Sequence, residues 1–425
     1  MSAAEPLEAA QSVPAGGINL ADFCRLTGIN ANLAMMNTPE SPSARRQRSR
    51  QQLLEVIRRE NGVTRADLSL ITGLSRSAVA EAVQDLMNER LIAEDVLSGG
   101  RGVGRGRPSA LLVATGGDGH VVGIDFDHER VTVAVAQVDG QIRAEEHAAV
   151  NVDSEAAAAL DVAAGMVHRL LGQTGLSLGE IRAVAAGVPA PLDIKTSRIH
   201  QASVLSGWVG LDPARELADR LGRPVVIGND ADLGAAGELR FGVAKGARDF
   251  IYVKASEGIG AGLVLGGSVY RGAAGAAGEI GHTRLGEQGA WCRCGNRGCL
   301  ETVVSSTLVR QLMREIGLPA GRDEIFPLAE VALHPVIGRF IAEAGRTLGR
   351  VLADLSNCLN PGLIVLGGEL GTAGEALADG VRESINRYAQ PAIATAVEVK
   401  LAALGLRSEL LGAIGLAGQH ALLEI

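Results

Sequence analysis

Three cysteines and one histidine lie in a short stretch of the chain and carry side chains that bind zinc. They are His282, Cys292, Cys294 and Cys299. Thiolate sulfur and neutral imidazole are the ligands that tetrahedral Zn²⁺ selects, and a Cys₃His set fills all four positions, as in a structural site. The alternative is a disulfide, but a chain without secretory features favours reduced thiols. The stretch therefore predicts a structural zinc site.

Two carboxylates flank this stretch. Glu279 precedes the histidine, and Glu301 follows the last cysteine. A closed zinc site leaves both carboxylates free, and the metal would fix the backbone that presents them. Rigid carboxylates suit hydrogen bonding to a polyhydroxyl ligand, so both are candidates for a sugar site.

The motifs that contain these residues resemble the signature of the ROK family, which comprises repressors, open reading frames of unknown role and sugar kinases. They read Gly-Glu-x-Gly-His at residues 278–282 and Cys-x-Cys-Gly-x-x-Gly-Cys-x-Glu at residues 292–301. The resemblance implies that the histidine and the three cysteines bind zinc. It also implies that Glu279, His282 and Glu301 face a sugar.

A third motif, Asn229-Asp230, follows an apolar strand. In this position the kinases of the family place the aspartate that serves as base for the sugar hydroxyl. Asp230 could bind that hydroxyl without any chemistry. The alternative for Asp230 and Glu301 is that they are solvated surface acids.

The loops that would hold a nucleotide depart from the kinase pattern. The family's Asp-x-Gly-Gly-Thr corresponds to Asp-Phe-Asp-His-Glu at residues 125–129, and its Gly-Thr-Gly-x-Gly to Ser-Glu-Gly-Ile-Gly at residues 256–260. Extra carboxylates beside a triphosphate would cost on the order of several kcal/mol. The chain is therefore predicted not to bind ATP and not to be an enzyme. The sugar side also departs, because Val204 stands where the family has a sugar-contacting asparagine.

The composition is that of an α/β protein with two or three domains. The chain has 425 residues, of which 47% are hydrophobic and 3% aromatic, and a formal net charge of −8. No apolar run is long enough to span a bilayer and no signal peptide is evident, which predicts a cytoplasmic protein without membrane insertion. Residues 41–110 carry twelve arginines against eight acidic residues, a net charge of +4. This asymmetry indicates a basic N-terminal module on an acidic body.

Residues 44–115 are predicted to form a winged helix-turn-helix domain behind a flexible tail at residues 1–43. Helical patterns cover residues 45–60, 65–72 and 76–90, with Thr64 and Ser75 as N-caps. Strands at residues 91–93 and 110–113 flank a wing rich in glycine and arginine. The candidate DNA-binding residues are Arg45, Arg46, Arg48, Ser75, Arg76, Ser77, Arg101, Arg105 and Arg107. The alternative is a winged helix that makes dimer contacts.

Residues 120–425 alternate between strands and helices in two similar sets, which begin near residues 121 and 250. The ROK resemblance implies a duplicated actin-like, hexokinase-like ATPase fold with two lobes around a sugar-binding cleft. The predicted fold class is therefore α/β, with an N-terminal winged helix-turn-helix and a structural zinc loop. Cys24 and Cys358 carry no evident chemistry, and Cys358 is predicted to be a buried small hydrophobe.

These features predict a sugar-responsive DNA-binding transcriptional regulator that represses carbohydrate-metabolism genes. Its effector would be a sugar or sugar phosphate, bound by Asn229, Asp230, Glu279, His282 and Glu301. Its other partners would be a palindromic double-stranded DNA operator and further copies of the chain, as a homodimer or a dimer of dimers. The alternatives are an active ATP-dependent sugar kinase with a DNA-binding domain, and a regulator controlled by a protein partner.

Overall fold

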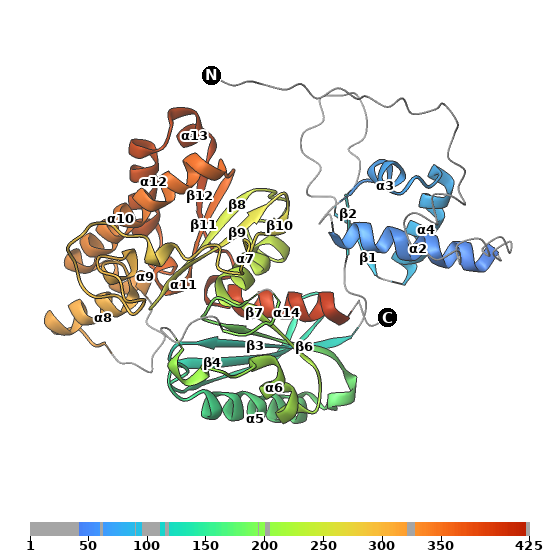
Figure 1. The fold of residues 1–425 in the computed structure, drawn as a ribbon, viewed down its shortest axis with the longest axis horizontal. Coiled ribbons are helices and arrows are strands. Elements are labelled where there is room, and N and C mark those ends of the chain that lie inside the picture. Colours follow the sequence, from blue (N-terminus) through green and yellow to red (C-terminus); the bar gives the residue numbers. More distant parts are fainter. Residues whose placement is uncertain are drawn as a thin grey trace, which may run out of the picture. The chain divides into compact units, whose positions relative to one another are not determined.

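The structure of the protein is a computed structural model, which describes residues 42–59, 63–89, 91–95, 111–114, 119–193, 195–199, 205–320 and 328–421. Five residues discussed above lie outside these ranges: Cys24, Arg101, Arg105, Arg107 and Val204. Across the ranges described, no helix combines the length and the apolar character needed to cross a membrane. The chain is α/β, as its sequence predicts (Figure 1).

The N-terminal elements have the order of a winged helix-turn-helix. They are α2 (Pro42–Arg59), α3 (Arg65–Thr72), α4 (Arg76–Asn88), β1 (Ile92–Asp95) and β2 (Leu111–Ala114). Helix α2 begins inside the predicted tail, because Pro42 has no N–H to lose and its fixed φ suits the first turn of a helix. Strands β1 and β2 pair antiparallel, and Leu112 also pairs with Val63.

Capping side chains set the turn between α3 and α4, as predicted. Thr64 and Asp67 form a capping box at the start of α3, and Gly73 ends that helix in the left-handed conformation. The Ser75 side chain accepts a hydrogen bond from the N–H of Ala78 at the start of α4. Beneath these helices lies a core of fully buried side chains that includes Leu53, Leu68, Val83, Leu86 and Leu112.

Two five-stranded sheets with the same topology form the rest of the chain. The first sheet has the order β5-β4-β3-β6-β7, and the second has the order β10-β9-β8-β11-β12. Strands of the first sheet are β3 (His120–Asp127), β4 (Arg130–Gln137), β5 (Ile142–Ala149), β6 (Ile181–Val188) and β7 (Val225–Asn229). Strands of the second are β8 (Phe250–Ala255), β9 (Ile259–Leu265), β10 (Ser268–Val269), β11 (Leu363–Gly367) and β12 (Glu398–Leu401).

The pairing directions repeat as well. In each sheet the first three strands along the chain are antiparallel, and the fourth and fifth run parallel to the first. This repetition confirms the duplicated fold. Strand β12 was not predicted, because it is only four residues long and two of its residues, Glu398 and Lys400, are exposed charges.

Helices cover both faces of each sheet (Figure 1). On the first sheet, α5 (Ala156–Thr174) and α6 (Pro213–Leu221) pack on one face and α14 (Ser408–Ala421) on the other. On the second sheet, α8 (Ser306–Glu315), α10 (Pro335–Leu359) and α12 (Glu375–Tyr388) pack on one face and α7 (Asp230–Arg240) on the other. The short helices are α9 (Leu328–Val331), α11 (Gly368–Gly371) and α13 (Pro391–Ala396). We call the two sheets with their helices the first and the second lobe.

One prediction about the helices is wrong. Cys358 is exposed on α10 instead of buried. The buried residues near this end of the helix include Leu352 and Ser356. Cys358 follows Ser356 by two positions, so it points to the opposite face of the helix.

Helices α7 and α14 pack closely and join the lobes. A Cβ atom on Gly412 would lie 1.8 Å from the carbonyl oxygen of Leu233, and one on Gly237 would lie 2.2 Å from that of Ser408. The fully buried carboxylate of Glu238 accepts hydrogen bonds from the backbone N–H of Leu404 and from the Ser408 hydroxyl. Glycine is therefore required where the two helices touch.

We expect Gly412→Ala to destabilise the two lobes by about 3 kcal/mol or more, because the added methyl group must push the helices apart. Gly415→Ala is the matched control in the same helix, since its Cβ would lie 3.4 Å from the nearest atom, in Arg240. The control should be neutral or stabilising by up to about 1 kcal/mol. Thermal unfolding of both variants checks this. Equal midpoints for the two would contradict it.

Candidate metal and sugar site

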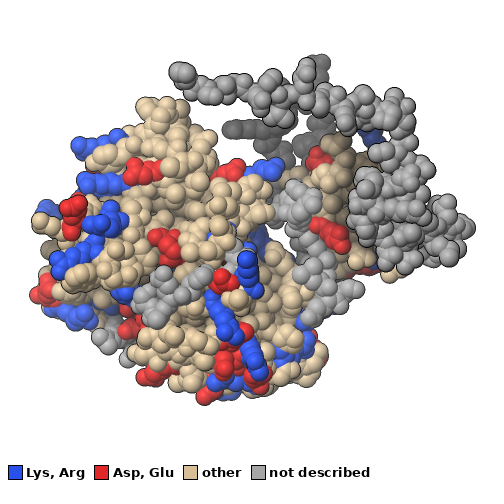
Figure 2. Space-filling model, in the orientation of Figure 1, with Lys and Arg blue, Asp and Glu red and all other residues tan. Residues whose placement is uncertain are grey.

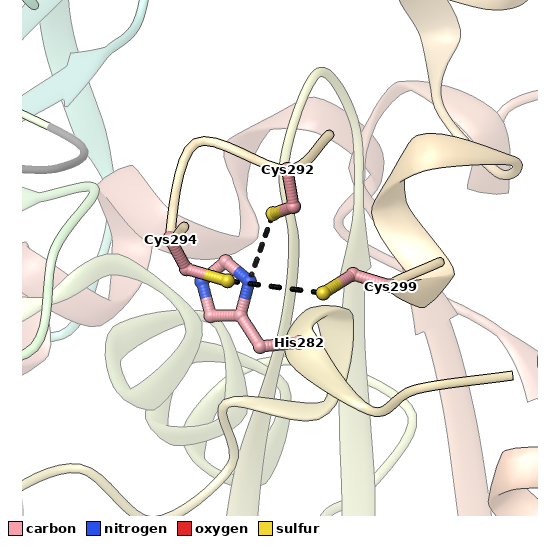
Figure 3. A group of neighbouring side chains, drawn as sticks. All are labelled: His282, Cys292, Cys294 and Cys299. Carbon is pink, nitrogen blue, oxygen red and sulfur yellow. Dashed lines mark hydrogen bonds between the residues drawn. The ribbon is translucent and has the colours of Figure 1, made fainter. Parts of the chain in front are cut away.

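The structure brings the four predicted metal ligands together. His282 ends the short helix η4 (Ile280–His282), and Cys299 immediately precedes η5 (Leu300–Thr302). Cys292 and Cys294 lie in a tight turn that is closed by a hydrogen bond from the N–H of Cys292 to the carbonyl of Asn296. One ligand atom from each of the four side chains lies within 4.8 Å of the others (Figure 3).

The distances between these atoms fit a tetrahedral zinc ion. The sulfur atoms of Cys294 and Cys299 are 3.7 Å apart, and Cys292 Sγ is 3.5 Å from Nδ1 of His282. A tetrahedron with Zn–S of about 2.3 Å and Zn–N of about 2.0 Å has an S···S edge of about 3.8 Å and an S···N edge of about 3.5 Å. A disulfide would need sulfurs about 2.05 Å apart, and all three thiols are free. The residues therefore fit zinc better than a disulfide.

His282 belongs to the metal cluster and to the sugar candidates at once. Its Nδ1 faces the cysteine sulfurs, whereas Nε2 lies 3.7 Å from Oε2 of Glu279. A metal held on Nδ1 leaves Nε2–H to donate to a carboxylate or a ligand. The Cys292 thiol lies 3.1 Å from Oε1 of Glu301, and that oxygen is 3.8 Å from Nδ1 of His282. The loop thus fixes both glutamates beside the metal cluster.

A pocket opens between the lobes next to this loop. All five predicted sugar-binding residues line it, namely Asn229, Asp230, Glu279, His282 and Glu301. Three basic residues that sequence reasoning missed also line it: His128, Lys254 and Arg293. Asp230 and Glu301 are not surface acids, because their side chains are only 10% and 11% exposed.

The junction of β7 and α7 gives Asn229 and Asp230 different tasks. The Asn229 side chain caps α7 by accepting from the N–H of Asp232 at 3.1 Å, and it donates to the carbonyl of Ala190 at 3.1 Å. Oδ1 of Asp230 accepts from the N–H of Ala231. Asn229 therefore positions the junction, and Asp230 presents its carboxylate to the pocket.

Lys254 of β8 pairs with Asp230 at the junction of β7 and α7 and neutralises its charge. Its Nζ lies 2.7 Å from Oδ2 of Asp230 and 3.2 Å from Oδ1 of Asp127, and the residue is 7% exposed. Burial alone would lower the pKa of Lys254, but the charges of Asp127 and Asp230 raise it well above its usual value. The signal in the sequence was a lone lysine in the otherwise apolar strand β8.

A second ionic contact links the loop that carries the candidate metal ligands, residues 282–299, to the first lobe; we call this segment the metal loop. Arg293 lies between two of the metal-ligand cysteines, and its Nη1 is 3.5 Å from Oδ2 of Asp153. The His128 imidazole donates from Nδ1 to Oδ1 of Asp153 at 2.7 Å. Burial by itself would lower the pKa of His128, but the Asp153 hydrogen bond and the charges of Asp127 and Asp153 raise it.

The two candidate nucleotide turns occupy equivalent places in the two sheets. The first joins β3 to β4 at His128-Glu129, and the second joins β8 to β9 around Glu257. The sequence suggested that Asp127 is an unpaired negative charge at the first of these turns. In the structure it is paired with Lys254. Burial by itself would raise the pKa of Asp127. The charges of Lys254, His128 and Arg130 outweigh burial and lower this pKa far below its usual value. Burial raises the pKa of Glu257, and the charge of Glu129 adds to that effect.

The start of α4 carries the predicted DNA-contacting turn. Ser75, Arg76 and Ser77 are all exposed there. The Ser75 hydroxyl serves as the helix cap and lies 3.0 Å from that of Ser77, which leaves Arg76 as the long donor of this turn. Arg46 and Arg48 are exposed on α2, whereas the side chain of Arg45 lies outside the described part of the chain. On the face drawn in Figure 2, basic and acidic side chains are mixed over the two lobes.

Comparisons with known proteins match both the N-terminal part of the chain and the two lobes. A profile described as ROK family matches residues 121–420, and one described as winged helix-turn-helix DNA-binding matches residues 46–93. The xylose repressor of Bacillus spizizenii is 27% identical over 87% of this chain and 94% of its own length. The glucokinase of Streptomyces coelicolor is 30% identical over 70% of this chain and 98% of its own length. The fold matches that of a ROK family transcriptional regulator with a TM-score of 0.67 at 22% identity, over 89% of this chain and 98% of the other.

We expect the purified protein to contain about one zinc ion per chain, because the four donors form a closed tetrahedral set. Cys299→Ser should lose the ion and melt at least about 5 °C lower, since the loop around it depends on the metal. Cys358→Ser, on the exposed face of α10, is the control. Elemental analysis and thermal unfolding check both variants. Zinc retained by Cys299→Ser would contradict the assignment of the ligands.

We expect the His128–Asp153 pair to stabilise the protein more at pH 6 than at pH 9. The pKa of His128 is raised on folding, so its contribution is complete below the unfolded pKa of about 6.5 and is lost as the pH rises through the folded pKa. Asp153→Asn should therefore lower the thermal midpoint by about 2 °C at pH 6 and by less at pH 9.

The control for this pH series is Asp161→Asn. Asp161 pairs with Arg220, which stays charged throughout this range. Its effect should not change between pH 6 and pH 9. A parallel pH response of the two variants would rule out titration of His128 as the cause.

Proposed function

Because the chain belongs to the ROK family, we propose that it is a sugar-responsive DNA-binding transcriptional regulator that represses carbohydrate-metabolism genes. The observation that carries the proposal is the combination, in one chain, of a winged helix-turn-helix with a cleft lined by all five side chains predicted to bind a sugar. The Bacillus relative with similarity over 87% of this chain is a xylose repressor. We assign residues 44–115 to the DNA-binding domain and residues 120–425 to the sugar-binding domain.

The effector in this proposal is a sugar held by the pocket carboxylates. Asp230, Glu279 and Glu301 would accept hydrogen bonds from sugar hydroxyls, and Nε2–H of His282 would donate one. Zinc is structural in this proposal, because three cysteines and Nδ1 of His282 fill its coordination sphere. The metal would hold the loop that presents Glu279, His282 and Glu301.

The cleft serves as a sensor in this proposal instead of a catalytic site. A base must be free to take the proton of the sugar hydroxyl, but Oδ2 of Asp230 already lies 2.7 Å from the Lys254 ammonium group. Both candidate nucleotide turns carry acidic side chains, among them Glu129 and Glu257. These charges disfavour a bound triphosphate.

Coupling between sugar and DNA would pass through the relation of the two lobes. A ligand changes DNA affinity only if it binds the DNA-competent and the incompetent arrangements unequally. A pocket whose walls come from both lobes provides such a difference. A cytoplasmic dimer, with two winged helices, would match an operator of two-fold symmetry.

Fluorescence anisotropy with promoter DNA of the adjacent genes tests the proposal. Arg76→Ala should weaken binding at least about tenfold, because a bidentate arginine–guanine contact contributes about 1–3 kcal/mol. Gln84→Ala, also exposed on α4, is the control and should bind as the wild type does. D-xylose or D-glucose should change the DNA affinity of the wild type. A titration in which no sugar changes it would leave the protein without a sugar-sensing role.

ATP binding separates the regulator from an active kinase. Calorimetry with MgATP should give no saturable binding, and no sugar should be phosphorylated. ATP turnover that disappears in Asp230→Asn would show that the chain is a kinase with a DNA-binding domain.

A further inference from the structure

The Lys254 ammonium group has one hydrogen-bond donor left for a ligand. Of its three N–H donors, one points to Asp230 and one to Asp127, at 2.7 and 3.2 Å. Lys254 and Asp230 both line the pocket, whereas Asp127 does not. A bound ligand that meets Lys254 therefore meets the Asp230 carboxylate at the same place.

We propose that Lys254 is a ligand-positioning residue that, together with Asp230, selects a free hydroxyl group and excludes a phosphate ester at that position of the sugar. This inference rests on the proposed sugar-sensing function and narrows its effector to an unphosphorylated sugar.

The chemistry of the pair matches an alcohol. A hydroxyl group accepts one hydrogen bond and donates another, so it can accept from Lys254 Nζ and donate to a carboxylate oxygen of Asp230. The short Lys254 contact fixes that carboxylate in place before the ligand arrives. A hydrogen atom in place of the hydroxyl would leave the remaining ammonium donor without a partner in a buried site, which costs binding energy.

The charge around Lys254 opposes a phosphate group. One ammonium faces two ionised carboxylates, Asp230 and Asp127, so the group has a net charge of −1. Burial raises the pKa of the neighbouring Asp125 well above its usual value and that of Glu409 to about 7, so neither carboxyl is counted as a full negative charge here. A phosphate monoester brings about −1.5 to −2 charges of its own and no hydroxyl hydrogen that Asp230 needs.

The other basic side chains of the pocket do not offset the net negative charge around Lys254. His128 is paired with Asp153, and Arg293 lies near both Asp153 and Glu301. Lys254, His128 and Arg293 are thus each engaged by at least one carboxylate. A lysine in a pocket ordinarily suggests an anion site, but here the surrounding acids reverse that expectation.

Calorimetry on the full-length, zinc-containing protein tests the inference. The probes are D-glucose, its monodeoxy analogues and its monophosphates, with D-xylose and its monodeoxy analogues and monophosphates as a second series. We expect one hydroxyl position at which the deoxy analogue binds at least about tenfold more weakly and the phosphate ester at least about a hundredfold more weakly. In Lys254→Met the parent sugar should bind more weakly, and the penalty for that deoxy analogue should shrink.

The possible outcomes distinguish failure of this inference from failure of the proposed sugar-sensing function. Lys245→Met makes the same change at an exposed lysine and should leave every affinity unchanged. The wild-type probe series gives an answer even if Lys254→Met fails to fold. If every phosphate ester binds as tightly as its parent sugar, the inference is wrong although the protein still senses sugars. If the parent sugars, deoxy analogues and phosphates all fail to bind, the proposed function falls and the inference falls with it.

Discussion

A buried ammonium group connects the two lobes at the floor of the pocket. Lys254 comes from β8 of the second sheet, whereas Asp127 ends β3 and Asp230 follows β7 in the first. Moving these charges out of water is costly, and their mutual attraction offsets that cost only while all three stay together. Loss of one partner leaves a buried charge uncompensated, so the lobes are held in the arrangement that keeps Lys254 between the two carboxylates.

The metal loop makes a second connection at another part of the pocket. Arg293 sits between Cys292 and Cys294, and Asp153 of the first lobe lies between it and His128. A metal ion held by the four candidate ligands would fix the backbone on either side of Arg293 and restrict where the guanidinium can reach. The cluster therefore has a structural consequence beyond the loop itself, because it places a cation that faces the opposite lobe.

Relatives with this domain include a xylose repressor and a glucokinase, so the fold alone assigns neither activity. The glucokinase of Streptomyces coelicolor matches this chain over 98% of its own length, so the lobes of the two proteins are the same domain. The five residues predicted to bind a sugar are compatible with either activity. The ion pair on Asp230 and the acidic turns are features of the side chains alone, and they favour binding over phosphate transfer.

The sequence by itself determined the features that depend on neighbours in the chain. It predicted the N-caps at Thr64 and Ser75, the duplicated strands, and the four metal-ligand candidates, because caps and closely spaced ligands are local geometry. All five residues that the sequence predicted to bind a sugar line the pocket. Only the tertiary structure revealed the partners of Lys254, since Asp127 lies 127 positions away and the two meet only when the lobes pack. Arg293 and Asp153 are likewise distant in the chain and meet only in the folded protein. The charge of Asp127, which in the sequence looked repulsive to a phosphate, is neutralised by Lys254 for the same reason.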